Sequence, residues 1–295
     1  MIWDKPLHAA FPDLLERAGT FYCCFREGDN HAGGQEGTVR LLKSSDAVQW
    51  KPAAHLSLSG VDLRDPPLSI TPDGRFMLIM GGSIYEKGVF KTCFPRLTFS
   101  KDGKRWDPIT SLTTLPYEWI WAVEWFDGIA YGLSYRTDQT PWLLTLFSSR
   151  DGVHFSPLHK FRLRKNPSEG RLRFQKDGTM IALLRERGSG KIGVAAPPYK
   201  KWKWHSLKGH LGGSNFVMED DACMWAAARR LREGQKKNKK EIEAYVSLAK
   251  MTKTSFKEVC EVPSGGDCGY PGLVIQEKPS TWPTILLVVE NGNLD

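Results

Sequence analysis

The residues best suited to chemistry lie at the two ends of one predicted hairpin, residues 168–187. Its first strand opens with Glu169, a Lys-Asp-Gly turn at 176–178 reverses the chain, and an apolar second strand ends in Arg185. Because a hairpin returns the chain to the end where it began, we expect Glu169 and Arg185 to share one end of a sheet. Carboxylates can move protons, and the planar guanidinium of arginine binds carboxylates through two hydrogen bonds. This end of the sheet is therefore the candidate site.

A repeating pattern in the chain must position that hairpin. The signature Ser-x-Asp-x-x-x-aromatic occurs at 44–50, 100–106 and 149–155, a spacing of roughly fifty residues. Related turns at 197–204 and 251–256 fall at the next two steps of the same period. Five turns at a regular period indicate a repeat architecture.

A second set of hairpin turns lies between those signatures, at 71–75, 126–128, 176–178 and 219–221. Runs of β-branched and aromatic residues flank them, so each repeat holds two hairpins and hence a four-stranded antiparallel sheet. Repeats of this length and strand content predict an all-β, six-bladed β-propeller that forms one domain over residues 1–295. The expected blades are 8–55, 56–110, 111–157, 158–207, 208–258 and 259–295, with residues 1–7 as a candidate closing strand for the short last blade.

The composition is typical of a soluble globular protein. Hydrophobic residues make up 41% of the chain, and no apolar run nears the roughly 20 residues of a membrane helix. The first seven residues lack the basic stretch and apolar run of a secretory signal, which favours a cytoplasmic location without assigning one. The six cysteines form no C-x-x-C pair and no zinc-like spacing with histidine, so we expect mostly buried thiols and no metal or cofactor.

The net charge of +8 favours anionic partners, including acidic sugars, phosphates and nucleic acid. Much of the excess lies in the segment 229–240, between two strand-like runs, and it most simply forms a solvated hairpin loop. No RNP-like, zinc-finger or helix-turn-helix pattern accompanies this segment. Nucleic acid is therefore a disfavoured partner.

The serine–aspartate–aromatic turns resemble Asp boxes, the BNR-repeat hairpins of sialidase-type β-propellers. The candidate hairpin is similar to sialidase strands in which Glu-x-x-Leu precedes an Asp-Gly turn and an apolar strand ending in Arg; here these are Glu169, Leu172, residues 177–178 and Arg185. The segment 266–273 looks like the one that presents the sialidase tyrosine, at Tyr270. Residues 11–14 and 20–28 look like the first sialidase blade, so the resemblance covers nearly the whole chain.

The resemblance implies a sialidase-like glycoside hydrolase that acts on a terminal, acidic sugar. In such an enzyme Tyr270 would be the nucleophile, Glu169 its base, and Asp65, at the start of a strand, the general acid. A neutral tyrosine suits a sialoside, because the substrate's own carboxylate would repel a carboxylate nucleophile. The expected partner is an acidic glycan, with no cofactor, metal ion or membrane.

The resemblance also implies a set of substrate-binding groups: Arg26, Arg185, Arg229, Glu27, His31 and Trp121. Where sialidases have the first arginine of a carboxylate-binding triad, this chain has Ala10, in Ala10-Phe11-Pro12. Arg26, on the neighbouring strand, is the candidate replacement.

Other interpretations stay open from the residues alone. Glu169 as an exposed acid, Tyr270 as a core residue and Asp65 as a turn cap would each be structural. A catalytically inactive glycan-binding propeller, or a protein-interaction propeller that docks through residues 229–240, would keep the fold. A retaining glycosidase would instead use two carboxylates, Glu169 and Asp65, about 5 Å apart.

Overall fold

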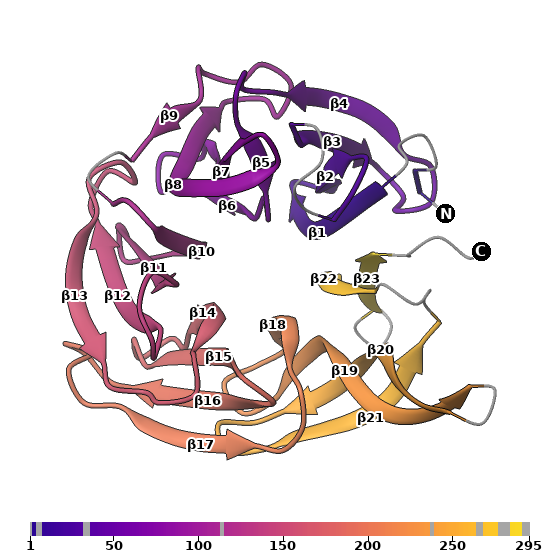
Figure 1. Cartoon of the computed structure of the whole chain (residues 1–295). Helices are drawn as coiled ribbons and strands as arrows, with labels where there is room; N and C mark the ends of the chain where they lie inside the picture. Colours follow the sequence, from indigo (N-terminus) through magenta and orange to yellow (C-terminus); the bar gives the residue numbers. More distant parts are fainter. Residues whose placement is uncertain are drawn as a thin grey trace.

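The computed structural model describes residues 2–3, 8–31, 36–112, 115–236, 239–263, 268–276 and 284–290. These residues form strands and connecting turns, with no helix among them. Figure 1 shows the sheets arranged radially around a central axis, with each sheet running outward from an innermost strand. The chain is thus an all-β propeller of antiparallel blades.

Each sheet consists of strands that follow one another along the chain. Blade 1 comprises β1 (His8–Arg17), β2 (Thr20–Gly28), β3 (Thr38–Ser44) and β4 (Lys51–Leu56). Blade 2 comprises β5 (Asp62–Arg64), β6 (Leu68–Ile70), β7 (Phe76–Glu86), β8 (Val89–Ser100) and β9 (Thr110–Ser111). Blade 3 comprises β10 (Glu118–Phe126), β11 (Ile129–Arg136), β12 (Leu143–Ser149) and β13 (Ser156–Phe161).

Two further blades complete the set of full sheets. Blade 4 comprises β14 (Ser168–Phe174), β15 (Met180–Glu186), β16 (Ser189–Ala195) and β17 (Lys203–Leu207). Blade 5 comprises β18 (Gly212–Met218), β19 (Met224–Lys236), β20 (Lys239–Met251) and β21 (Phe256–Val262). A two-stranded sheet of β22 (Gly269–Gln276) and β23 (Thr284–Glu290) follows.

The prediction of six four-stranded blades is wrong, because the described residues form five blades and the two-stranded sheet. Each of the five blades carries a turn of the repeated kind between its last two strands, and the segment 259–290 contains none. The β22–β23 sheet packs against β1 and β18 and so lies between blades 5 and 1 (Figure 1). The expected N-terminal closing strand falls mainly on residues outside the described ranges, and residues 2 and 3 are not in a strand.

The three Ser-x-Asp turns share one set of hydrogen bonds. In the turn between β12 and β13, Asp151 Oδ1 accepts hydrogen bonds from the backbone N–H groups of Val153 and His154, both at 2.8 Å. Ser149 Oγ accepts one from the N–H of Gly152 at 3.0 Å. The turns at 44–50 and 100–106 repeat the aspartate contacts. Their serine and aspartate side chains therefore satisfy backbone N–H groups of the turns.

The basic segment 229–240 is not a loop, contrary to the sequence-based expectation. It continues β19 and β20 as a long hairpin, in which only residues 237–238 lie outside the strands and outside the described ranges. Cross-strand pairing sustains the extension, since Arg232 bonds to Glu243 at 2.9 Å and to Glu261 at 2.7 Å. Arg229, in the middle of β19, lies beside Gly269 of β22.

None of the six cysteines forms a disulfide bond. Four of them are buried: Cys23, Cys24, Cys93 and Cys268. Cys223 is partly buried and Cys260 is exposed. The prediction of mostly buried thiols is confirmed.

Candidate functional site

The innermost strands are irregular at the same level of the ring. Register shifts interrupt β1, β10, β14, β18 and β22 near their first residues, and the inner strand of blade 2 is split between β5 and β6. The residues at these irregularities are Phe11, Asp65, Trp121, Glu169, Gly213 and Tyr270. A β-bulge bends the strand and changes the direction of the side chain located at the bulge. Six positions far apart in the sequence thus meet around the axis.

Most of these residues adopt a strained backbone. Phe11, Asp65, Glu169 and Tyr270 have φ values between 47° and 59°, in the left-handed region that L residues avoid. Each such residue costs of order 1–3 kcal/mol, which the surrounding fold must offset. Strain of this kind is common where side chains are aimed at a ligand.

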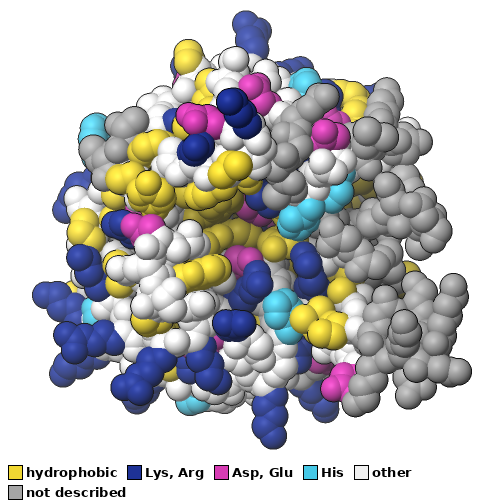
Figure 2. Space-filling view, viewed as in Figure 1, with side chains coloured by type: hydrophobic (Ala, Val, Ile, Leu, Met, Phe, Trp, Pro, Cys, Tyr) yellow, Lys and Arg dark blue, Asp and Glu magenta, His cyan; other side chains and the backbone are white. Residues whose placement is uncertain are grey.

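Most of the irregular residues line a small axial pocket that opens to solvent. Its walls include Phe11, Asp65, Trp121, Gly213 and Tyr270. Figure 2 shows a hollow near the centre of the face it presents, with hydrophobic, acidic and basic side chains around it. Apolar walls with a few converging polar groups are typical of small-molecule sites.

On the side of blades 4 and 5, the structure brings together a tyrosine, a carboxylate and two arginines. The hydroxyl of Tyr270 lies 3.4 Å from Glu169 Oε1, at the long limit of a hydrogen bond. The backbone N–H of Gly213 donates to Glu169 Oε2 at 2.6 Å, and Arg185 forms an ion pair with the same carboxylate. Arg229 lies over the ring of Tyr270, 5.0 Å from its centroid. The predicted meeting of Glu169 and Arg185 at one end of the sheet is confirmed.

The electrostatics of this side keep the tyrosine neutral. Burial, and then the charge of Glu169, raise the pKa of Tyr270 well above its usual value. Burial, and then the charges of Arg185 and Arg229, lower the pKa of His210 to about 4. Tyr270 therefore keeps its proton in neutral solution, and Glu169 is the carboxylate within hydrogen-bond distance of its hydroxyl.

Asp65 lies on the opposite wall of the pocket and is 7% exposed. Burial raises its pKa to about 7; the charge of Arg64 opposes the rise and that of Glu169 adds to it. The carboxyl group is thus protonated in mildly acidic solution, and it can donate a proton into the pocket.

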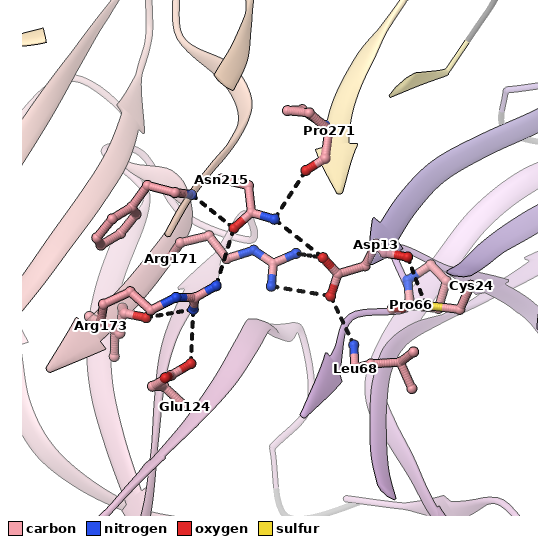
Figure 3. Close-up of polar contacts among 11 residues, drawn as sticks. Asp13, Cys24, Pro66, Leu68, Glu124, Arg171, Arg173, Asn215 and Pro271 are labelled. Carbon is pink, nitrogen blue, oxygen red and sulfur yellow. Dashed lines mark hydrogen bonds and ion pairs between the residues drawn. The ribbon is translucent and has the colours of Figure 1, made fainter. Parts of the chain in front are cut away.

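A polar network forms the floor of the pocket (Figure 3). Asp13 accepts hydrogen bonds from Asn215 at 3.3 Å and from the backbone N–H of Leu68 at 2.9 Å, and it pairs with Arg171 at 3.0 Å. Asn215 also donates to the carbonyl oxygen of Pro271 at 3.0 Å. The network joins blades 1, 2, 4 and 5 to the residue that follows Tyr270, so it holds the tyrosine's strand in place.

Five of the six predicted binding residues are not among the residues that line the pocket. Arg185 and Arg229 contact Glu169 and Tyr270, and the other three are Arg26, Glu27 and His31. Arg26 is fully buried, with Nε paired to Asp62 at 2.7 Å and Nη1 bonded to the carbonyl of Asn30 at 2.7 Å. Glu27 accepts hydrogen bonds from Trp3 at 2.6 Å and from Arg40 at 2.9 Å.

The third, His31, packs edge-on against Phe11, with ring centroids 5.1 Å apart. His31 therefore contacts a residue that lines the pocket, but it does not line the pocket itself. Trp121, by contrast, is part of the lining, as expected.

Sequence reasoning missed Asp13, Phe11 and Arg64. The guanidinium of Arg64 lies over Phe11 at 5.2 Å and over Trp119 at 5.9 Å. A signal was present: the dipeptides at 11–12, 65–66 and 270–271 each place proline after the inward residue. All three residues before proline have positive φ at the start of an inner strand, so the dipeptides mark one structural position.

Within the described ranges, no group of three or more His, Cys, Asp or Glu residues could hold a metal ion. Over the same part of the chain, no helix is long and apolar enough to cross a membrane.

Comparison with known proteins identifies the fold. No protein-family model matches the chain, and no curated protein matches it. Among solved structures, a protein of unknown function from Dyadobacter fermentans is 18% identical with a TM-score of 0.73, over 96% of this chain and 95% of that one. A Trypanosoma rangeli sialidase is 12% identical with a TM-score of 0.65, over 96% of this chain and 55% of that one.

A third solved structure is an exo-β-1,3-galactanase from Clostridium thermocellum, 16% identical with a TM-score of 0.61, over 85% of this chain and 61% of that one. The chain thus spans little more than half the length of the two glycosidases. At these identities the likeness establishes a propeller fold shared with glycoside hydrolases.

Proposed function

We propose that the chain is a sialidase-like glycoside hydrolase that removes a terminal, acidic sugar bound in the axial pocket. The observation that carries the proposal is the contact between Tyr270 and Glu169, which lie 101 residues apart, opposite a protonated Asp65. The fold shared with a sialidase and an exo-galactanase supports the assignment of glycosidase activity. In this proposal the Ser-x-Asp turns are Asp boxes.

Each residue has one role in a two-step reaction, in which every transferred proton has a donor and an acceptor. The oxygen of Tyr270 attacks the anomeric carbon while Glu169 takes the phenolic proton, and Asp65 protonates the departing glycosidic oxygen. Water then attacks the anomeric carbon, with Asp65 taking its proton, and the tyrosine oxygen leaves with the proton that Glu169 held. Gly213 and Arg185 orient the carboxylate of Glu169 throughout.

The test is hydrolysis of a fluorogenic sialoside beside a panel of other aryl glycosides. Glu169→Gln and Tyr270→Phe should each lower kcat/KM by about 10²–10⁴. Tyr199→Phe is the matched control, since it removes a buried hydroxyl that donates to the carbonyl of Gly178 far from the pocket. Absence of turnover for every glycoside by the folded chain would instead leave a binding propeller.

A second candidate is a retaining glycosidase with two carboxylates. The favouring observation is that Asp65 carries a raised pKa while Glu169 is ion-paired, as expected for an acid and a nucleophile in one site. Tyr270→Phe separates the candidates, because a two-carboxylate enzyme keeps most of its turnover without the phenolic hydroxyl.

A further inference from the structure

A second cavity lies on the axis, on the other side of the polar floor from the axial pocket. Residues near the start of the inner strands line the axial pocket, and later residues of β1, β6, β10, β14, β18 and β22 line this second cavity, the rear well. Asp13 and Arg171 line both cavities, so the floor separates them. The rear well has a volume of about 460 Å³ and opens to solvent, a size typical of small-molecule sites.

The charged residues of the rear well are balanced in pairs. Five of the described residues that line it are charged. Arg171 pairs with Asp13 at 3.0 Å, and Arg173 pairs with Glu124 at 2.8 Å (Figure 3). The fifth, Glu16, is exposed near the end of β1 and accepts a hydrogen bond from a backbone N–H of the turn that follows. The interior of the well thus has no excess charge, and a charged ligand would lose its hydration there without gaining an opposite charge.

The pair of Glu124 and Arg173 keeps hydrogen-bonding capacity for a ligand. Arg173 donates to Oε2 of Glu124, and no described residue donates to Oε1. The guanidinium of Arg173 has five N–H donors, and three described acceptors receive them: Glu124, the carbonyl oxygen of Leu172 and Asn215. The side chains of Glu124 and Arg173 are 30% and 20% exposed. The pair can therefore both accept a hydrogen bond from a ligand and donate one to it.

The rest of the wall is largely apolar. Partly exposed apolar side chains of five inner strands line the well, among them Ile70, Trp125, Val217, Met218 and Ile275. A pyranose ring offers the complementary chemistry. Its C–H groups pack on apolar side chains, and its neighbouring hydroxyl groups both donate and accept hydrogen bonds.

We infer that the rear well is a second binding site, which takes an uncharged pyranose unit and holds its hydroxyl groups with Glu124 and Arg173. The site is separate from the axial pocket and does not depend on the hydrolysis proposed there. Its preference for an uncharged sugar is opposite to that of the axial pocket, for which an acidic sugar is proposed.

The experiment is calorimetric titration of the whole chain with methyl β-glucoside, which is neutral, and methyl β-glucuronide, which is an anion. Burial raises the pKa of Glu124, and the charges of Arg173 and Arg171 oppose the rise, so a mildly alkaline buffer keeps this carboxyl group ionised. Val217→Trp fills the well and should weaken binding of the glucoside by about tenfold or more. Any glucuronide bound in the axial pocket should remain bound.

Glu124→Gln tests the pair itself. The variant loses a charged acceptor and should bind the glucoside about tenfold more weakly, the effect of losing a hydrogen bond to a charged group. It also leaves Arg173 without its carboxylate, so the well becomes cationic and the glucuronide should gain affinity.

Glu118→Gln is the matched control. Glu118 is also a carboxylate of β10 and is 7% exposed, and it accepts a hydrogen bond from Ser134, but it lines neither cavity. This variant should bind both glycosides like the parent. Thermal unfolding of each variant verifies that it folds.

Three results would overturn the inference. If the folded parent binds no glucoside, the well is not a sugar site. If Val217→Trp binds the glucoside as tightly as the parent, the sugar binds elsewhere, and if Glu124→Gln does so, the pair does not hold it. Failure of the proposed hydrolysis is a separate result, since it appears as absence of turnover rather than as a change in glucoside binding.

Discussion

The two walls of the axial pocket balance their charges in different ways. On the wall of blades 4 and 5, the carboxylate of Glu169 receives a backbone N–H and an arginine, and it lies within reach of a tyrosine. On the wall of blade 2, Arg64 lies over the rings of Phe11 and Trp119, and the charges of Asp65 and Asp62 raise its pKa against the effect of burial. The carboxylate of the first wall is held by hydrogen bonds, whereas the arginine of the second is held by aromatic contacts and nearby charges.

This contrast suggests a division of labour. A preorganised, hydrogen-bonded carboxylate needs no rearrangement to act as a base. A buried acid with a pKa of about 7 can give up its proton in neutral solution. In the proposed reaction, one wall therefore supplies the base and the other the acid.

The largest effect is expected at the floor, where Arg171 forms an ion pair with buried Asp13. Arg171→Gln removes the partner of buried Asp13 and should lower the free energy of unfolding by about 3–5 kcal/mol. Arg136→Gln, which breaks an exposed pair with Asp138, should cost less than about 1 kcal/mol. Urea denaturation of both variants measures the difference, and equal losses would show that the network contributes nothing beyond a surface pair.

A second expected effect concerns the pH dependence of the blade 2 wall. If Asp65 is the general acid, kcat/KM should fall about tenfold per pH unit above about 7, as the carboxyl group loses its proton. Asp65→Asn should remove this limb together with most of the activity. A rate profile unchanged between pH 6 and 9 would assign proton donation to another group.

The same carboxyl group should affect stability with the opposite sign from an ordinary aspartate. Its pKa is raised in the folded state, so the native protein binds more protons than the unfolded chain between pH 4 and 7. Its contribution to the free energy of unfolding is therefore present below about pH 4 and is lost as the pH rises through about 7. The stability of the parent relative to Asp65→Asn, measured by denaturation from pH 4 to 8, should therefore fall as the pH rises, because the amide of the variant does not titrate.

The smallest expected effect distinguishes Arg64 from the paired arginines. Because Arg64 has no described acceptor, Arg64→Gln should change the free energy of unfolding by less than about 1 kcal/mol. Arg26→Gln should destabilise the fold far more, since it leaves Asp62 buried without its cation. Similar losses for the two variants would mean that Arg64 has a structural partner, and the contrast between the walls would disappear.

The sequence by itself determined the local features of this protein. The Ser-x-Asp turns, the Asp-Gly hairpins and the meeting of Glu169 with Arg185 depend on residues a few positions apart or on paired neighbouring strands. Turn hydrogen bonds and hairpin register follow from local chemistry, so a propeller of four-stranded blades could be inferred from their period.

Only the tertiary structure decided which residues surround the axis. The number of full blades, the contact of Tyr270 with Glu169 and the floor around Asp13 depend on strands that lie more than a hundred residues apart. It also placed Arg26 in a buried pair with Asp62 and left Arg64 beside the pocket, although both are inner-blade arginines in the sequence. The physical reason is that a bulge aims its side chain locally, whereas the partner it meets is set by how the blades close around the axis.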